Sequence, residues 1–210
     1  MTNNHYYTND ETIKHNRKTW QVMLKGFNMS FTSDNGVFSK NTVDFGSKLL
    51  IESFGLETKT GKILDVGCGY GPMGLTVAKA FPDSQIEMVD VNLRALELAK
   101  ENAEINKITN THIYESSVYD NVTANDYQAI ISNPPIRAGK KIVHAILEGA
   151  YDHLQETGEL WIVIQKKQGG PSAEKKMEEV FGNVETVAKD KGYFIFKSVK
   201  NQVVSSVETC

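Results

Sequence analysis

The sequence predicts an α/β protein built on a mostly parallel sheet. From residue 62 to residue 165, short apolar runs alternate with longer segments whose apolar residues recur at helical spacing. A glycine-rich stretch, DVGCGYGPMG at residues 65–74, follows directly on the first apolar run. Strands that alternate with helices form parallel sheets covered on both faces, and ligands bind at the carboxyl ends of such strands. We therefore expect a ligand site at the edge of the sheet that carries the glycines.

The first 55 residues predict an appendage to this alternating part. Residues 20–24 and 27–32 predict two short strands joined by a turn, and the apolar positions from Asn41 to Gly55 predict a helix. The polar residues 1–16 are expected to be loosely held. We expect residues 1–55 to pack on a core of residues 56–210, as one structural domain overall.

The rest of the chain predicts alternating elements and a final hairpin. The expected strands are residues 62–66, 85–89, 112–114, 129–132 and 160–165, and the expected helices are residues 72–81, 92–106, 141–154 and 172–181. Pro72 suits a first helical position, and Ser172 is expected to cap the last helix with Glu174 in its first turn. Residues 184–189 and 193–199 flank Lys191-Gly192 and predict an antiparallel hairpin.

Composition narrows the class of protein. The net charge of −3 means that nucleic-acid binding would need a local basic patch. Cys68 and Cys210 give neither a disulfide framework nor metal-ligand spacing. No apolar run approaches the roughly 18 residues of a membrane span, and the polar start lacks the apolar centre of a signal peptide. We expect a cytoplasmic protein that uses no metal and no membrane.

The charge beside the glycines decides between two nucleotide cofactors. Residues 69–74 spell G-x-G-x-x-G, the dinucleotide fingerprint, yet Asp65 would repel a diphosphate. Asp65 favours a cation, and S-adenosylmethionine (AdoMet) carries an ammonium and a sulfonium but no phosphate. Asp90 ends the next expected strand and is placed to accept hydrogen bonds from ribose hydroxyls, as also happens in NAD sites. Either aspartate could instead cap the next helix or turn. An NAD-dependent oxidoreductase is disfavoured by Asp65 and by the lack of an evident hydride-transfer site.

A second motif, SNPPIRAG at residues 132–139, lies on the same sheet edge. Its two prolines remove backbone donors and stiffen the chain, which leaves carbonyl groups free. The Asn133 side-chain oxygen and the Pro134 carbonyl could accept both hydrogens of an exocyclic amine and aim the nitrogen lone pair at a methyl group. The alternative is a simple rigid turn. The pair of motifs favours methyl transfer to an amino nitrogen.

DVGCGYG and NPPI, together with GVFSKNTVDFGSKLLIE at residues 36–52, resemble the methyltransferase small-domain family. Its best-known members are small-subunit ribosomal RNA guanine-N2 methyltransferases. The similarity runs over nearly the whole chain from about His5. It implies a Rossmann-like AdoMet-dependent methyltransferase fold, with a mostly parallel seven-stranded sheet and AdoMet as cofactor. It also implies ribosomal RNA or the small ribosomal subunit as partner. Two-domain members carry an additional N-terminal domain, for which we expect no counterpart here.

The resemblance assigns roles to residues of this sheet edge. The implied catalytic residues are Asn133, Pro134 and Pro135; the implied cofactor-binding residues are Asp65, Gly67, Cys68, Gly69, Gly71, Asp90, Val91, Ser117 and Asn133; and the implied substrate-binding residues are Ile136, Arg137 and Phe38. Ser117 stands where the family usually has Asn or Asp, and Ile136 where an aromatic residue is common. The segment around Phe38, Ser39 and Asp44 would lie over the cofactor as a lid.

The predicted activity is therefore AdoMet-dependent methylation of a guanine N2 amine in small-subunit ribosomal RNA. A protein glutamine or a DNA adenine remains an alternative acceptor, and a non-catalytic RNA-binding assembly factor is a further alternative. The cations best placed for a phosphate are Arg137, Lys140 and Lys141. A second group, Lys166, Lys167, Lys175 and Lys176, is either a solvated surface or a further RNA contact. We expect His144 and His153 to be packing or surface residues.

Overall fold

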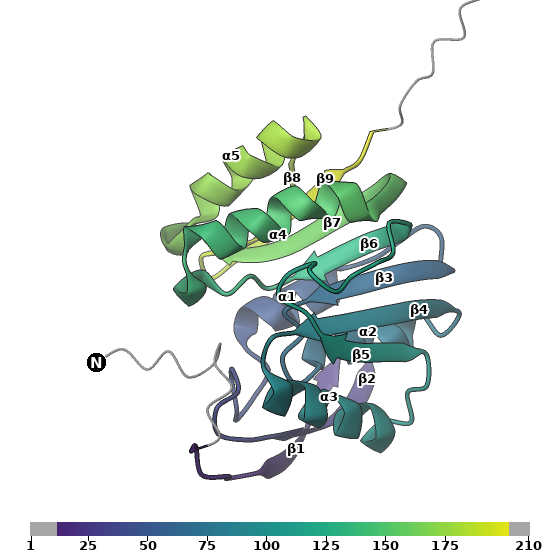
Figure 1. Ribbon diagram of the computed structural model, residues 1–210, viewed down its shortest axis with the longest axis vertical. Coiled ribbons are helices and arrows are strands. Elements are labelled where there is room, and N and C mark those ends of the chain that lie inside the picture. The colour runs from purple at the N-terminus through teal and green to yellow at the C-terminus, as the bar shows by residue number, and fades with distance from the viewer. Residues whose placement is uncertain (1–11, 202–210) are drawn as a thin grey trace, which may run out of the picture.

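The computed structural model describes residues 12–201, and these residues form a central sheet, a separate hairpin and five α-helices (Figure 1). The sheet strands are β3 (Gly61–Val66), β4 (Ser84–Asp90), β5 (Thr111–Glu115), β6 (Tyr127–Ser132), β7 (Leu154–Gln165), β8 (Glu185–Asp190) and β9 (Tyr193–Val199). The hairpin strands are β1 (Lys18–Leu24) and β2 (Phe27–Ser33). The helices are α1 (Phe45–Ser53), α2 (Pro72–Ala80), α3 (Leu93–Ile105), α4 (Lys140–His153) and α5 (Gly170–Phe181), with 3₁₀ turns η2 (Ile136–Ala138) and η3 (Lys166–Gln168). Cys210 and the first eleven residues lie outside the described part of the chain.

The central sheet has seven strands in the order β5-β4-β3-β6-β7-β9-β8. Strands β3 to β7 pair in parallel, whereas β9 runs antiparallel to both β7 and β8. This confirms the expected mostly parallel sheet with a C-terminal antiparallel hairpin. The chain winds outward from β3 in one direction and from β6 in the other, so the topological switch point lies between these two central strands. Ligands of open α/β sheets bind at this point.

Two apolar layers explain why the sheet is covered on both faces. One core joins α1, α2, α3 and the β1–β2 hairpin to the sheet, and the other joins α4 and α5 to the opposite face. All six residues of β6 are buried, as expected for a central parallel strand. No helix within residues 12–201 is long and apolar enough to span a membrane.

The β1–β2 hairpin is held against α3 by two asparagines one helical turn apart. The Asn102 side chain accepts from Thr32 N at 2.7 Å and donates to Thr32 O at 3.0 Å and to Tyr70 O at 2.9 Å. Asn106 makes the equivalent pair of hydrogen bonds with the backbone of Ser30. Each amide thus pairs with the backbone N–H and C=O of one β2 residue as a neighbouring strand would, and the hairpin needs no further strand there.

Three predicted element starts are wrong for identifiable reasons. The first helix begins at Phe45 and not at Asn41, because the Asp44 side chain caps it. Helix α5 begins at Gly170 with Gly169 as its N-cap, because Gly169 adopts a left-handed conformation (φ 106°). Ser172 is therefore no cap, its hydroxyl bonds to His144, and Glu174 lies beyond the first turn. Strand β7 begins at Leu154, six residues before the expected start. A register shift in its pairing with β6 lets the turn-like residues 155–158 join the strand.

Candidate cofactor and acceptor site

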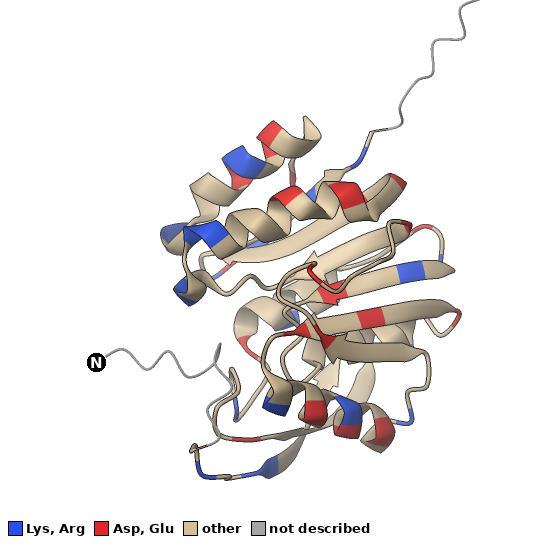
Figure 2. Ribbon diagram, viewed as in Figure 1, with Lys and Arg blue, Asp and Glu red and all other residues tan. Residues whose placement is uncertain are grey.

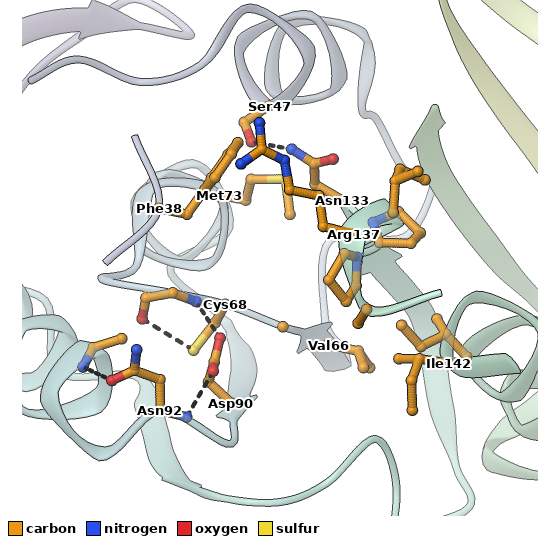
Figure 3. Close-up of a pocket in the computed structure, with 18 of the residues that line it drawn as sticks. Phe38, Ser47, Val66, Cys68, Met73, Asp90, Asn92, Asn133, Arg137 and Ile142 are labelled. Atoms are coloured by element: carbon orange, nitrogen blue, oxygen red, sulfur yellow. Dashed lines mark hydrogen bonds between the residues drawn. The ribbon is translucent and has the colours of Figure 1, made fainter. Parts of the chain in front are cut away.

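A pocket of about 640 Å³ lies at the carboxyl ends of β3, β4 and β6, at the switch point of the sheet. Its volume is in the usual range for a small-molecule site. Most of the predicted site residues line this pocket, namely Phe38, Gly67, Cys68, Gly69, Asp90, Val91, Ser117, Asn133, Pro134, Pro135, Ile136 and Arg137. Figure 3 shows Asn133 at one side of the cavity, pointing toward Ser47, and Asp90 at another.

The glycine-rich turn after β3 leaves open space beside its backbone. Gly67 and Gly69 have positive φ angles of 77° and 56°, and a Cβ built on either would meet nothing within 4 Å. The Gly67 and Cys68 amides donate to Val89 O at 2.8 and 2.9 Å, which ties the turn to the end of β4. A ligand can therefore approach this backbone closely.

Gly71 has a different role from the one expected for it. It is the left-handed N-cap of α2 (φ 99°), and an added Cβ would lie 2.7 Å from the Leu75 side chain. It is absent from the pocket wall. Gly71 therefore serves the packing of α2 against the turn, while Pro72 occupies the first helical turn as predicted.

Asp65 also lies away from the pocket wall. Alternation along β3 places Leu64 and Val66 in one core, so Asp65 points to the opposite face, beneath the start of α2. It is 0% exposed and accepts from Gly74 N at 2.8 Å through Oδ2. Its Oδ1 is buried without a hydrogen-bond partner among the described residues. Burial raises the pKa of Asp65 to about 7, the Gly74 N–H opposes the rise, and nearby Asp90 adds to it.

This raised pKa makes folding stability depend on Asp65 ionisation. Unfolded aspartate has a pKa of about 3.9, so between about pH 4 and pH 7 the folded protein binds more protons than the unfolded chain. Stability should fall as pH rises through this window, by at most about 1.4 kcal/mol per pH unit from this one group. The variant Asp65→Asn keeps the shape and an oxygen for Gly74 N. In urea unfolding at pH 5, 6, 7 and 8, we expect wild type to lose stability relative to this variant. If the free energy of unfolding changed equally with pH in wild type and in Asp65→Asn, the raised pKa of Asp65 would be contradicted.

Asp90 lies at the end of β4 and faces the pocket. Its Oδ2 accepts from Gly69 N and its Oδ1 from Asn92 N, each at 2.9 Å. Burial raises the pKa of Asp90, and these backbone donors, with that of Val91, oppose the rise. A carboxylate has about four acceptor positions, so Asp90 keeps acceptor capacity toward the cavity while it fixes the glycine turn.

The segment 36–47, which we call the strap, crosses the pocket from the side of the hairpin. Three residues at the carboxyl edge of the sheet hold it. Asn92 Nδ2 donates to Gly36 O, the Tyr70 hydroxyl lies 3.2 Å from both Ser39 O and Thr42 O, and Asn133 Nδ2 contacts the side chains of Asp44 and Ser47. Phe38, Ser39, Asp44 and Ser47 line the cavity.

The motif after β6 presents Asn133 from the strap side of the pocket. Asn133 Nδ2 lies 3.0 Å from Ser47 Oγ and 3.3 Å from each oxygen of Asp44. Pro134 and Pro135 follow on the wall, and η2 then places Ile136 and the exposed Arg137 at the mouth. The Asn-Pro-Pro corner thus faces the glycine-rich turn across one cavity.

The pocket is also lined by Cys68, by Ser117 and by residues that the sequence did not predict. Burial raises the pKa of the Cys68 thiol well above its ordinary value, which fits a small packed residue and not a nucleophile. Ser117 is exposed at the rim. Ser47, Met73 and Tyr193 also line the pocket but were not predicted. Asp44 precedes an apolar run as a helix cap would, and this pattern could have placed Ser47 in the first turn of the helix that it caps.

The sequence profile of the methyltransferase small domain matches residues 28–197 of this chain, which is most of its length. The chain belongs to the methyltransferase small-domain family. It is accordingly an AdoMet-dependent methyltransferase of α/β fold.

Three known proteins are similar to this methyltransferase in sequence or in fold. It is 56% identical over 197 residues to the uncharacterized protein YbxB of Bacillus subtilis (strain 168), covering 93% of this chain and 98% of that protein. It is 36% identical to the ribosomal RNA small subunit methyltransferase C of Vibrio parahaemolyticus, covering 88% of this chain and 53% of that enzyme. A solved T. thermophilus 16S rRNA N2 methyltransferase (RsmC), in complex with AdoMet and guanosine, aligns with a TM-score of 0.77 at 24% identity, over 88% of this chain and 51% of that one. This methyltransferase spans about half the length of both named enzymes.

Two features of the pocket fit AdoMet. The open space beside Gly67 and Gly69 accepts a ligand at backbone distance. Asp90 would hold the ribose from the end of β4. None of these features needs a metal, and residues 12–201 contain no cluster of metal-ligating side chains.

Proposed function

We propose that this protein methylates the exocyclic N2 amine of a guanine in small-subunit ribosomal RNA, in the cytoplasm. The observation that carries the proposal is the Asn133-Pro134-Pro135 corner, which lines the same pocket as the glycine-rich turn. The named relatives that act on small-subunit ribosomal RNA support the choice of substrate.

The residues of the pocket can activate an amine by orientation. AdoMet supplies an electrophilic methyl group when bound. The Asn133 Oδ1 and the Pro134 carbonyl would accept the two N–H groups of the amine and fix the direction of its lone pair. No side chain is needed as a base, because the amine becomes acidic as it is alkylated and can release its proton to water.

The mouth of the pocket carries cations that suit an RNA backbone. Arg137, Lys140, Lys141, Lys166 and Lys167 are exposed and form no ion pair within the described chain. They flank the cavity at η2, η3 and the start of α4, where Figure 2 shows basic residues gathered at the ends of α4 and α5. We call these five residues the basic rim.

Two further lysines from the predicted second group are already paired. Lys175 lies 3.7 Å from Glu179, and Lys176 lies 3.0 Å from Glu148 and 3.1 Å from Glu179. Their charges are partly compensated within the protein. We propose that phosphate contacts belong to the basic rim and not to Lys175 and Lys176.

Removing two rim charges should weaken RNA binding in a salt-dependent way. For the double variant Lys140→Ala/Lys141→Ala, each lost contact with a single-stranded phosphate should make the slope of log K against log[salt] less negative by about 0.7. Binding of a small-subunit RNA fragment, measured between low and moderate KCl concentrations, tests this expectation. The variant Lys175→Ala is a matched control on the neighbouring helix and should keep the wild-type slope. Equal slopes for all three proteins would exclude Lys140 and Lys141 as RNA contacts.

Methyl transfer with labelled AdoMet tests the proposed function directly. We expect label in small subunits or ribosomal RNA that lack the modification, released by ribonuclease and mapped to guanine N2. Label released by protease would indicate a protein glutamine, and label in DNA would indicate adenine. No transfer to any acceptor by the wild type would leave an RNA-binding factor without activity.

A further inference from the structure

We propose that Asp44 and Ser47 are positioning residues that turn the Asn133 amide so that its oxygen, and not its nitrogen, is presented to the acceptor amine. This inference rests on the proposed function, because it assigns the Asn133 oxygen its partner. The observation behind it is the set of contacts from Asn133 Nδ2 to Ser47 Oγ at 3.0 Å and to both Asp44 oxygens at 3.3 Å.

The chemistry of a carboxylate fixes the orientation. An asparagine side chain carries a donor end and an acceptor end of nearly equal shape, so packing alone does not choose between them. A carboxylate can only accept hydrogen bonds, so the end of Asn133 that faces the Asp44 side chain must be the NH₂ group. The opposite end, Oδ1, is then left for another donor. In the flipped orientation Asn133 would present N–H groups to an amine whose own hydrogens need acceptors.

Asp44 is itself held in place, which makes it a rigid reference. Its Oδ1 also accepts from Gly46 N at 3.0 Å and from Ser47 N at 3.2 Å, as the N-cap of α1. Ser47 is buried in the first turn of the same helix. The start of α1 thus supplies both partners of Asn133 from one fixed turn.

The contact also links the strap to the catalytic motif. Asp44 and Ser47 lie 89 and 86 residues from Asn133 in the sequence. The same strap is bound to the glycine-rich turn through the Tyr70 hydroxyl. The orientation of the acceptor motif therefore depends on a segment that also covers the cofactor side of the pocket.

A purely structural role as a helix cap is the competing explanation, and Asp44→Ser separates the two. Serine caps helices about as well as aspartate, so helix α1 should remain capped while the carboxylate that faces Asn133 is lost. Ser47→Ala removes the second partner without touching the cap. Lys48→Ala, at the next and exposed position of α1, is the matched control.

Two measurements test the proposal. The first follows hydrogen exchange of the Asn133 side-chain NH₂ by nuclear magnetic resonance, in protein free of substrate. We expect exchange at least about fivefold faster in Asp44→Ser and in Ser47→Ala than in wild type or Lys48→Ala, because a hydrogen-bonded donor is protected. The second measures methyl transfer. We expect a kcat about tenfold lower in Asp44→Ser, with AdoMet affinity and thermal midpoint close to wild type.

Each outcome decides the proposal. Unchanged exchange of the Asn133 amide in both variants would overturn it. So would a loss of kcat matched by equal losses of AdoMet affinity and thermal stability, since that pattern indicates damage to α1. If wild type transfers no methyl group, the proposed function fails, and amide exchange alone then decides whether Asp44 and Ser47 hold Asn133.

Discussion

Replacing Asn133 with alanine is expected to lower kcat for methyl transfer by roughly 100- to 1000-fold, the usual effect of removing one preorganised group that orients the reacting atoms. The side chain contributes one of the two acceptors proposed for the amine, and its amide is already held by Asp44 and Ser47. AdoMet affinity should change far less, because the glycine-rich turn and Asp90 lie elsewhere on the pocket wall. Single-turnover methyl transfer and calorimetric titration with AdoMet measure the two effects.

The matched control for this prediction is Asn201→Ala, an exposed asparagine outside the pocket. It should retain the wild-type rate. If Asn133→Ala keeps its rate within about fivefold of wild type, the amine is not held by Asn133 and the proposed mechanism is wrong. A large loss of AdoMet affinity with little loss of kcat would instead assign Asn133 to the cofactor.

The alternating core could be predicted from the sequence because its signals are local. Asn92 caps α3 by accepting from Ala95 N, and Asn106 forms its C-terminal cap, so both expected limits of this helix are confirmed within one residue. The apolar runs of β3 and β6 fall in the two most buried strands of the sheet. A parallel strand that is buried on both faces has a continuous apolar run in its sequence, and such a run can be recognised in a single sequence.

Asp65 shows where a local pattern is misleading. Its position at the end of the first core strand placed it correctly near the cofactor turn, but charge alone did not say which face it would occupy. The strand period did hold that information, because Leu64 and Val66 are apolar and belong to the opposite face. Asp65 therefore occupies a buried position beneath the turn and does not line the pocket.

Long-range polar contacts were beyond prediction from the sequence. Nothing in NPPI indicates that its asparagine pairs with a residue 89 positions earlier. In the same way, Asn102 and Asn106 in α3 have the composition of a solvated helix face, yet both are buried against β2. Such contacts depend on which outer surfaces the fold brings together, and neither spacing nor periodicity encodes that.

Asn102→Leu is expected to destabilise the protein by about 3–5 kcal/mol, although leucine has the same branching pattern and suits a helix. The substitution removes the partners of Thr32 N, Thr32 O and Tyr70 O at a position that is 0% exposed. A buried backbone group that loses its partner costs about 1–3 kcal/mol, and water has little access here. Urea unfolding of variant and wild type, with the slope m compared as well as the midpoint, measures the loss.

Asn106→Leu provides a graded comparison on the same helix face. Asn106 is 8% exposed and its bonds to Ser30 are only partly buried, so water can replace some of what is lost and the expected cost is about half as large. A cost below about 1 kcal/mol for Asn102→Leu would show that the hairpin is held by apolar packing alone. The expected order has a functional consequence, because Tyr70 also bonds to the strap. Loss of the Asn102 contact should therefore displace Tyr70 and loosen the strap over the pocket before the sheet itself unfolds.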